Sequence, residues 1–273
     1  MNKNTDELID AFQPQAVRIP IDKCRLQETG LSFFDAMFPV CSELDVCKIQ
    51  NMLKESAAIL NESIAELTDQ AFADEATEKF FAKLPDMRDR LYRDSHSYLR
   101  NDPAAKSLEE VIITYPGFFA LAVHRIAHEL HLLNVPLVPR LFSEYAHSKV
   151  GIDIHPAAKI GKNLFMDHAT GIVIGETTEI GNNVKIYQGV TLGALYLEKT
   201  LSDVKRHPTV EDNVIIYSGA TILGGDTVIG HDSTIGGGAW LTHSVIPYSL
   251  VYNKVDVKVK TVKGFNEPNN YSI

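Results

Sequence analysis

The sequence contains few cysteines, the residue that marks disulfide-rich proteins. Among 273 residues there are three cysteines and one tryptophan. Cys24, Cys41 and Cys47 show no metal-type spacing. We therefore expect free thiols in a reducing compartment and no metal centre.

Long hydrophobic runs and basic blocks are also missing. The apolar stretch from Phe118 to Val123 is far shorter than the roughly 20 residues that span a bilayer. The first ten residues are polar and acidic, without the hydrophobic region of a signal peptide. The net charge of −9 argues against nucleic acid or an acidic membrane as a partner. We expect a cytoplasmic protein.

A six-residue repeat occupies the second half of a chain whose composition, 45% apolar and 22% charged, is ordinary for a globular protein. Small or apolar residues often stand four places after each repeated aliphatic, and glycine often follows it directly. The repeated aliphatic positions are Ile154, Ile160, Met166, Ile172, Ile174, Ile180, Ile186, Leu192, Val210, Ile216, Ile222, Ile229, Ile235 and Leu241.

This period fits neither a helix nor simple strand alternation and predicts a solenoid. Each hexad would be one short strand and one turn, and about three hexads would close a triangular coil. The pattern is that of a left-handed parallel β-helix. The alternative, a sandwich of hairpins, would repeat at about 8–12 residues. The gap between Leu192 and Val210 predicts a loop extruded from one corner.

The pattern of the first half of the chain predicts helices, so we expect an α+β protein. Its parts would be a helical domain over 1–148, a β-helix over 149–250 with the extruded loop at about 194–207, and a tail over 251–273. Apolar residues recur at helical spacing over 43–67, over 71–98 with a break at Pro85, and after Pro116. We expect these helices to cap one end of the solenoid.

Two polar segments interrupt the hexads, one at Asp153 to Pro156 and the other at Asp167 to Gly171. Their separation, a little under one coil, could bring Asp153 against His168. A carboxylate on one imidazole nitrogen makes the other nitrogen a better base. A structural hydrogen bond at a coil corner is the alternative.

Other polar residues have similarly open interpretations. Arg206, beside His207, could bind a substrate carboxylate or be a solvated loop base. Asp102 before Pro103 could simply open a helix as a cap. The helical histidines at 124, 128 and 131 lack the carboxylate of a zinc-protease pattern and suit packing.

Four sequence motifs lie in the solenoid: DIHPAAKIG from Asp153, DHATGIVIGET from Asp167, GVTLG from Gly189 and RHP from Arg206. With GFFAL and RIAH in the helical part, they resemble the serine O-acetyltransferase family. The resemblance covers about Asp102 to Pro247. It implies transfer of acetyl from acetyl-CoA to the hydroxyl of L-serine for cysteine synthesis, with no permanently bound cofactor.

The resemblance also implies roles for single residues. His168 would be the general base and Asp153 its orienting partner. Asp102 and Asp167 would bind the substrate ammonium, and Arg206 and His207 its carboxylate. The acetyl-CoA would lie between neighbouring solenoids of a homotrimer or hexamer, near Gly193, Ser218 and Gly219. The segments 194–205 and 252–257 depart from the family pattern beside this site.

The resemblance further implies cysteine as an inhibitor and the C-terminal Ile273 as an anchor for O-acetylserine sulfhydrylase. Three alternatives remain: another hexapeptide O-acetyltransferase acting on a sugar, a non-catalytic partner of the sulfhydrylase, and a zinc carbonic anhydrase on the same solenoid. The last would need three convergent histidines, two of them about five residues apart, and the solenoid histidines include no such pair.

Overall fold

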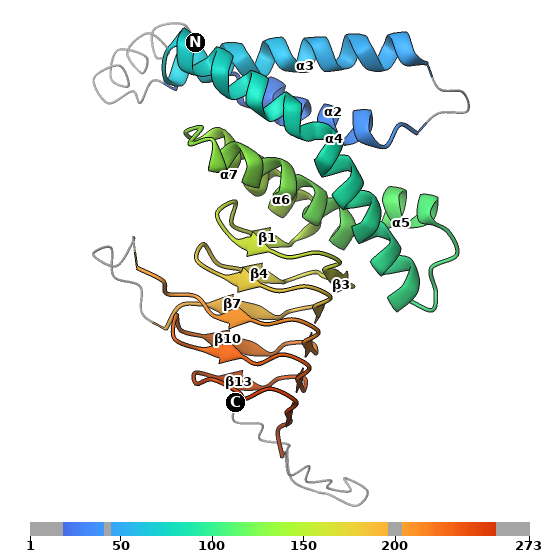
Figure 1. Ribbon diagram of the computed structural model, residues 1–273, viewed down its shortest axis with the longest axis vertical. Coiled ribbons are helices and arrows are strands. Elements are labelled where there is room, and N and C mark those ends of the chain that lie inside the picture. Colours follow the sequence, from blue (N-terminus) through green and yellow to red (C-terminus); the bar gives the residue numbers. More distant parts are fainter. Residues whose placement is uncertain (1–18, 41–44, 196–203, 255–273) are drawn as a thin grey trace, which may run out of the picture.

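A layer of helices lies on one end of a three-sided parallel β-helix in the computed structural model (Figure 1), which describes residues 19–40, 45–195 and 204–254. The helices are α2 (Lys23–Met37), α3 (Val46–Leu67), α4 (Gln70–Asn101), α5 (Leu108–Thr114), α6 (Pro116–Leu132) and α7 (Val138–Val150). The predicted α+β class is confirmed. Among these described helices, none alone is long and apolar enough to cross a membrane, although α5 and α6 together, bent by 74°, reach that length and composition.

Three parallel sheets form the sides of the solenoid. One side, sheet A, has the order β1-β4-β7-β10-β13, sheet B has β11-β8-β5-β2, and sheet C has β14-β12-β9-β6-β3. The strands are β1 (Asp153–Ile154), β2 (Lys159–Ile160), β3 (Phe165–Asp167), β4 (Val173–Ile174), β5 (Glu179–Ile180), β6 (Lys185–Tyr187), β7 (Thr191–Gly193), β8 (Thr209–Val210), β9 (Ile215–Ile216), β10 (Thr221–Leu223), β11 (Val228–Ile229), β12 (Thr234–Ile235), β13 (Trp240–Leu241) and β14 (Leu250–Val251).

The repeated aliphatic residues fill the interior of the coils as predicted. Every one of them from Ile154 to Ile235 is buried, and Leu241 in the last coil is partly buried. Each such side chain contributes about 1.5–3 kcal/mol on burial. The hexad register therefore fixes which residues point outward at the three corners of the solenoid.

One corner is tied together by a ladder of side-chain amides. Asn163, Asn183, Asn213 and Asp232 all have positive φ, which asparagine and aspartate tolerate better than most residues. Each amide nitrogen donates to the next side chain along the axis, at 2.9, 3.1 and 3.1 Å. The ladder holds the turns between sheets B and C in register.

Helix α4 differs from its expected form, because it continues through Pro85 instead of breaking there. A proline in a helix removes one hydrogen bond and favours a kink, and Figure 1 shows the helix bent along its length. The added length carries Asp94 and Ser97 onto the open end of the solenoid.

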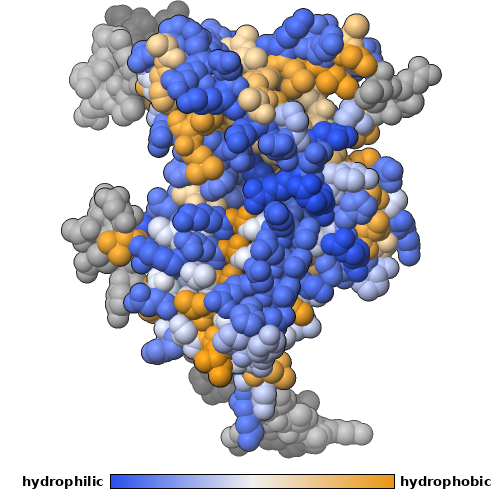
Figure 2. Space-filling model, in the orientation of Figure 1, coloured by the Kyte–Doolittle hydropathy of each residue, from blue (hydrophilic) through white to orange (hydrophobic). Residues whose placement is uncertain are grey.

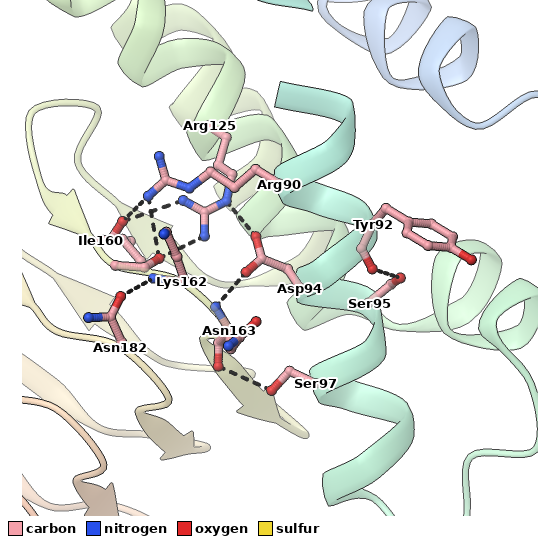
Figure 3. A network of polar contacts seen from close by, with 11 residues as sticks. Arg90, Tyr92, Asp94, Ser95, Ser97, Arg125, Ile160, Lys162, Asn163 and Asn182 are labelled. Carbon is pink, nitrogen blue, oxygen red and sulfur yellow. Dashed lines mark hydrogen bonds and ion pairs between the residues drawn. The ribbon is translucent and has the colours of Figure 1, made fainter. Parts of the chain in front are cut away.

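Among the described residues, no further coil precedes the first coil of the solenoid, so its outer backbone groups have no strand to pair with. Polar side chains from the helices bind these groups instead (Figure 3). Asp94 accepts a hydrogen bond from the backbone N–H of Asn163 at 2.8 Å and one from Arg125 Nε at 2.6 Å. Arg125 Nη2 donates to the carbonyl oxygen of Gly161 at 3.0 Å. Arg90 Nη2 donates to the carbonyl oxygen of Ile160 at 2.5 Å. The helical layer thus caps the exposed edge of the β-helix.

Candidate active site

The turn between β3 and β4 presents Asp167 and His168 at the edge where sheet C meets sheet A. His168 and Ala169 have φ of 54° and 57°, which is uncommon for residues other than glycine. The His168 side chain is 72% exposed, whereas that of Asp167 is 18% exposed. His168 Nδ1 lies 3.7 Å from Asp167 Oδ1, so the imidazole stands in the open beside a largely covered carboxylate.

Asp102 lies at the same edge. It is the C-cap of α4, so it does not open a helix as the capping alternative supposed. Its Oδ1 accepts from the backbone N–H of Ala104 at 2.8 Å, and its Oδ2 accepts from the Tyr115 hydroxyl at 2.5 Å. These two bonds, with the charge of nearby His168, hold the pKa of Asp102 below its usual value. We call Asp102, Asp167 and His168 the histidine corner.

A second group lies where sheet A meets sheet B, and we call Glu176, Arg206 and His207 the arginine corner. Arg206 forms an ion pair with Glu176 in the preceding coil. His207 Nδ1 accepts from the Thr177 backbone N–H at 3.2 Å and lies 2.9 Å from the Thr177 hydroxyl. The motif GET after Ile174 therefore supplies the supports on which Arg206 and His207 rest.

The imidazole of His207 is neutral near pH 7. Burial, assisted by the neighbouring Arg206 charge, lowers the pKa of His207 to about 4, and burial has the same effect on His155 at this edge. Because Nδ1 of His207 accepts a hydrogen bond from a backbone N–H, its proton is on Nε2. The arginine corner thus offers a guanidinium and a neutral N–H donor, which suit a carboxylate.

The two corners occupy opposite edges of sheet A within one protomer. His168 precedes β4, whereas Arg206 and His207 pack beside Gly175 to Thr177, which follow β4. At about 3.3 Å per residue, the strand and its turns separate the corners by roughly 15–20 Å. One protomer therefore does not bring Arg206 to His168.

Asp153 lies on β1, beside Val173 of β4, between the two corners. Within residues 19–40, 45–195 and 204–254, no hydrogen bond or ion pair joins it to His168, whose nearest paired carboxylate is Asp167. One potential ligand atom each from Asp153, Glu144 and His147 lies within 4.8 Å of the others. Glu144 is already paired with Arg140, and such exposed groups are common without an ion.

The residues expected near acetyl-CoA divide between the corners. Gly193 ends β7 at the edge that carries the arginine corner. Ser218 and Gly219 lie in the turn between β9 and β10, two coils below His168 on the same edge as the histidine corner. Ile273 lies outside the described residues.

Three residues with close contacts to these corners were missed in the sequence. Tyr115 bonds Asp102, Glu176 pairs with Arg206, and Thr177 supports His207. Glu176 and Thr177 lie inside a quoted motif, and hydrogen-bonding capacity at a coil corner was the available signal. No sequence signal pointed to Tyr115, because its contact depends on how α4 and α6 cross.

Comparisons with known proteins place these features in one family, although no family model matches the chain. A plasmid serine acetyltransferase of Synechococcus elongatus is 49% identical over 201 residues, which cover 72% of this chain and 60% of that protein. The serine acetyltransferase of Bacillus licheniformis is 53% identical over 123 residues, 45% of this chain and 55% of its own length. The chain thus spans less than two thirds of these two relatives.

Other relatives are covered more fully. Serine acetyltransferase 1 of Entamoeba histolytica, solved in complex with L-cysteine, matches with a TM-score of 0.76 at 35% identity over 85% of this chain and 87% of its own. The Neisseria gonorrhoeae serine acetyltransferase, solved in complex with serine, matches with a TM-score of 0.60 at 25% identity, covering 88% and 96%. The Bacillus subtilis serine acetyltransferase is 47% identical over 161 residues, which cover 59% of this chain and 72% of that protein. On this identity and coverage, the chain belongs to the serine acetyltransferase family.

Proposed function

We propose that the chain transfers acetyl from acetyl-CoA to the hydroxyl of L-serine and releases O-acetyl-L-serine for cysteine synthesis. The observation that carries this proposal is the histidine corner, where an open imidazole stands beside Asp167 and Asp102. A base needs access to the acceptor hydroxyl, and two carboxylates suit the ammonium group of an amino acid. Two solved relatives with serine or cysteine bound support this choice of ligand.

The proposed reaction balances without a metal or prosthetic group. His168 takes the proton of the serine hydroxyl while the serine oxygen attacks the thioester carbonyl carbon. The tetrahedral intermediate then collapses, the carbon–sulfur bond breaks, and the imidazolium returns the proton to the leaving thiolate. Acetyl-CoA is therefore a co-substrate, and no cofactor needs to remain bound.

The substrate carboxylate would be held by Arg206 and His207 of a neighbouring copy. Since the two corners of one protomer lie at opposite edges of sheet A, a homotrimer can place the histidine corner of one copy against the arginine corner of the next. Pairing of two trimers into a hexamer is compatible with this arrangement. The serine zwitterion would then be bound at both ends.

Asp153 keeps its proposed role as the orienting partner of His168. It lies on the face of sheet A that would meet the neighbouring copies, and it leads the strand that pairs with β4 next to the His168 turn. Asp153→Asn is therefore expected to lower kcat, whereas Asp167→Asn is expected mainly to raise the KM for serine, as steady-state kinetics with serine as the varied substrate would measure.

Acetyl-CoA would bind in the groove between two copies. Gly193 lies at one wall of that groove and Ser218 with Gly219 at the other, because they occupy the two edges of sheet A. Glycine lets the backbone approach the pantetheine chain closely.

The direct test is an acceptor comparison with the purified protein. Thiol release from acetyl-CoA is measured with L-serine, with a galactoside and with no acceptor. The proposal predicts release that depends on serine. Release only with the galactoside would favour a sugar O-acetyltransferase, and no release with either would favour a non-catalytic partner of the sulfhydrylase.

Gly175→Ala is expected to raise the KM for serine by about tenfold or more. A Cβ at Gly175 would lie 1.9 Å from Cδ2 and 2.1 Å from Nε2 of His207. The ring must move, and a displacement of about 1 Å at a substrate-positioning group can cost up to roughly 100-fold in rate. Steady-state kinetics with serine as the varied substrate measure the effect.

Gly181→Ala provides a matched control. Its Cβ would lie 2.3 Å from Asp212 Oδ1, so the crowding is comparable, but it lies at the corner between sheets B and C, away from both proposed half-sites. Both variants should have a lower melting temperature than the wild-type protein. Equal KM values for serine in the two variants would argue against a role for His207 in substrate binding.

Further partners belong to the same proposal. Cysteine, which differs from serine in one atom, would compete at the same pocket, and a cysteine complex is known for a solved relative. Ile273 would anchor the chain in O-acetylserine sulfhydrylase, and its deletion should abolish co-purification of the two proteins. We place these reactions in the cytoplasm.

A further inference from the structure

Tyr115 lies between helices α5 and α6, and its side chain reaches the histidine corner. It is the last residue before α6, and its φ of −84° and ψ of 113° leave it extended, as expected before Pro116. Its ring packs edge-on against Tyr98 at 5.9 Å between centroids, and Tyr98 is fully buried. The phenol is thus fixed by its own backbone and by a rigid neighbour.

The hydroxyl of Tyr115 is directed at a carboxylate. It donates to Asp102 Oδ2 at 2.5 Å, while the other oxygen of Asp102 accepts from the Ala104 backbone N–H. A carboxylate at a helix end with only one donor could rotate, whereas two donors on different oxygens fix its plane. Each oxygen of Asp102 keeps a further lone pair that can accept a hydrogen bond from a ligand.

Tyr115 also stands close to the second carboxylate of that corner. Burial and the hydrogen bond to Asp102 raise the pKa of Tyr115 to about 12, and the charge of Asp167 contributes in the same direction. The phenol therefore stays protonated at any physiological pH and remains a donor. The same hydrogen bond is the largest cause of the lowered pKa of Asp102.

We propose that Tyr115 is a positioning residue that orients Asp102 to receive the ammonium group of the amino-acid substrate. This inference rests on the proposed function and adds to it a residue that touches no reacting atom. Tyr115 acts through Asp102, so its removal should weaken substrate binding more than it slows the chemical step.

Tyr115→Phe is expected to raise the KM for serine by about tenfold, the scale of one hydrogen bond to a charged group. The KM for acetyl-CoA should not change, and kcat should fall less than threefold, because His168 and the thioester are untouched. The acidic limb of 1/KM for serine should also move to higher pH. Without the Tyr115 bond the pKa of Asp102 rises, so the carboxylate is protonated earlier as pH falls.

A double-mutant cycle with Asp102→Asn separates positioning from a general structural effect. If Tyr115 acts through Asp102, the double variant Tyr115→Phe with Asp102→Asn should have a KM for serine within about twofold of that of Asp102→Asn alone. Tyr92→Phe is the matched control, because it removes an exposed hydroxyl for which residues 19–40, 45–195 and 204–254 provide no hydrogen-bond partner. Replacing Tyr115 with 4-aminophenylalanine, which retains an N–H donor, should restore part of the affinity and also serves if the phenylalanine variant folds poorly.

The outcomes for Tyr115 and for the function are distinguishable. Wild-type protein that releases no thiol with serine contradicts the proposed function. Active wild type together with an unchanged serine KM and pH limb in Tyr115→Phe contradicts the positioning role alone. A tenfold effect that persists undiminished in the Asp102→Asn background also contradicts it.

Discussion

His168→Ala is expected to lower kcat by about 10²–10⁴-fold while leaving the melting temperature close to that of wild type. A general base that assists a neutral hydroxyl nucleophile contributes a rate factor of this size. The side chain is 72% exposed in the protomer, so its truncation removes little packing. Serine-dependent thiol release and thermal unfolding measure the two quantities.

His243→Ala is the control for this variant. His243 is an exposed histidine after the last strand of sheet A, three coils below the histidine corner. The kcat of His243→Ala should match that of wild type. A His168→Ala enzyme with normal turnover would remove the imidazole from the proposed mechanism.

Asp94→Ala is expected to destabilise the protein by about 3–5 kcal/mol, the cost of leaving a buried partner charge without compensation. The Asp94 and Arg125 side chains are 1% and 4% exposed, and the pair is 2.6 Å apart. The same carboxylate also holds the backbone N–H of Asn163 in the first coil. Loss of Asp94 would therefore loosen the helical layer from the solenoid. Chemical unfolding gives the free-energy difference.

Asp89→Ala tests whether the effect belongs to burial. Asp89 is 65% exposed on the same helix and lies 3.9 Å from Arg88. A surface pair of this kind contributes little, so the stability of this variant should be close to that of wild type. If Asp94→Ala unfolded at the same denaturant concentration as Asp89→Ala, the capping role of Asp94 would be wrong.

The face shown in Figure 2 is mostly hydrophilic where the helices meet the solenoid, with apolar patches above and below. The polar residues at this junction bind backbone atoms of the solenoid, and the periodicity of their own helical segments does not indicate these contacts. The sequence therefore predicted that helices cap the coil, but not that Asp94, Arg125 and Arg90 do so. Their partners lie roughly 35–70 residues away in the chain.

The repeat itself could be predicted because each coil has the same local rule. The repeated aliphatic residues from Ile154 to Ile235 are buried where the six-residue register puts them. The same register predicted that Asp167 and His168 leave the core at a turn. It does not indicate how far apart two turns of one coil lie, so the hexad register alone does not assign Arg206 and His168 to the same protomer or to different ones.

The central claim is that the histidine corner of one copy and the arginine corner of another complete one site, and subunit mixing tests it most directly. His168→Ala and Arg206→Ala, each inactive alone, are refolded together at equal amounts. In randomly mixed trimers about a quarter of the interfaces would carry both intact corners, so about a quarter of wild-type activity should return. Activity no greater than the sum of the separate variants would contradict the claim and place both residues in the site of a single protomer.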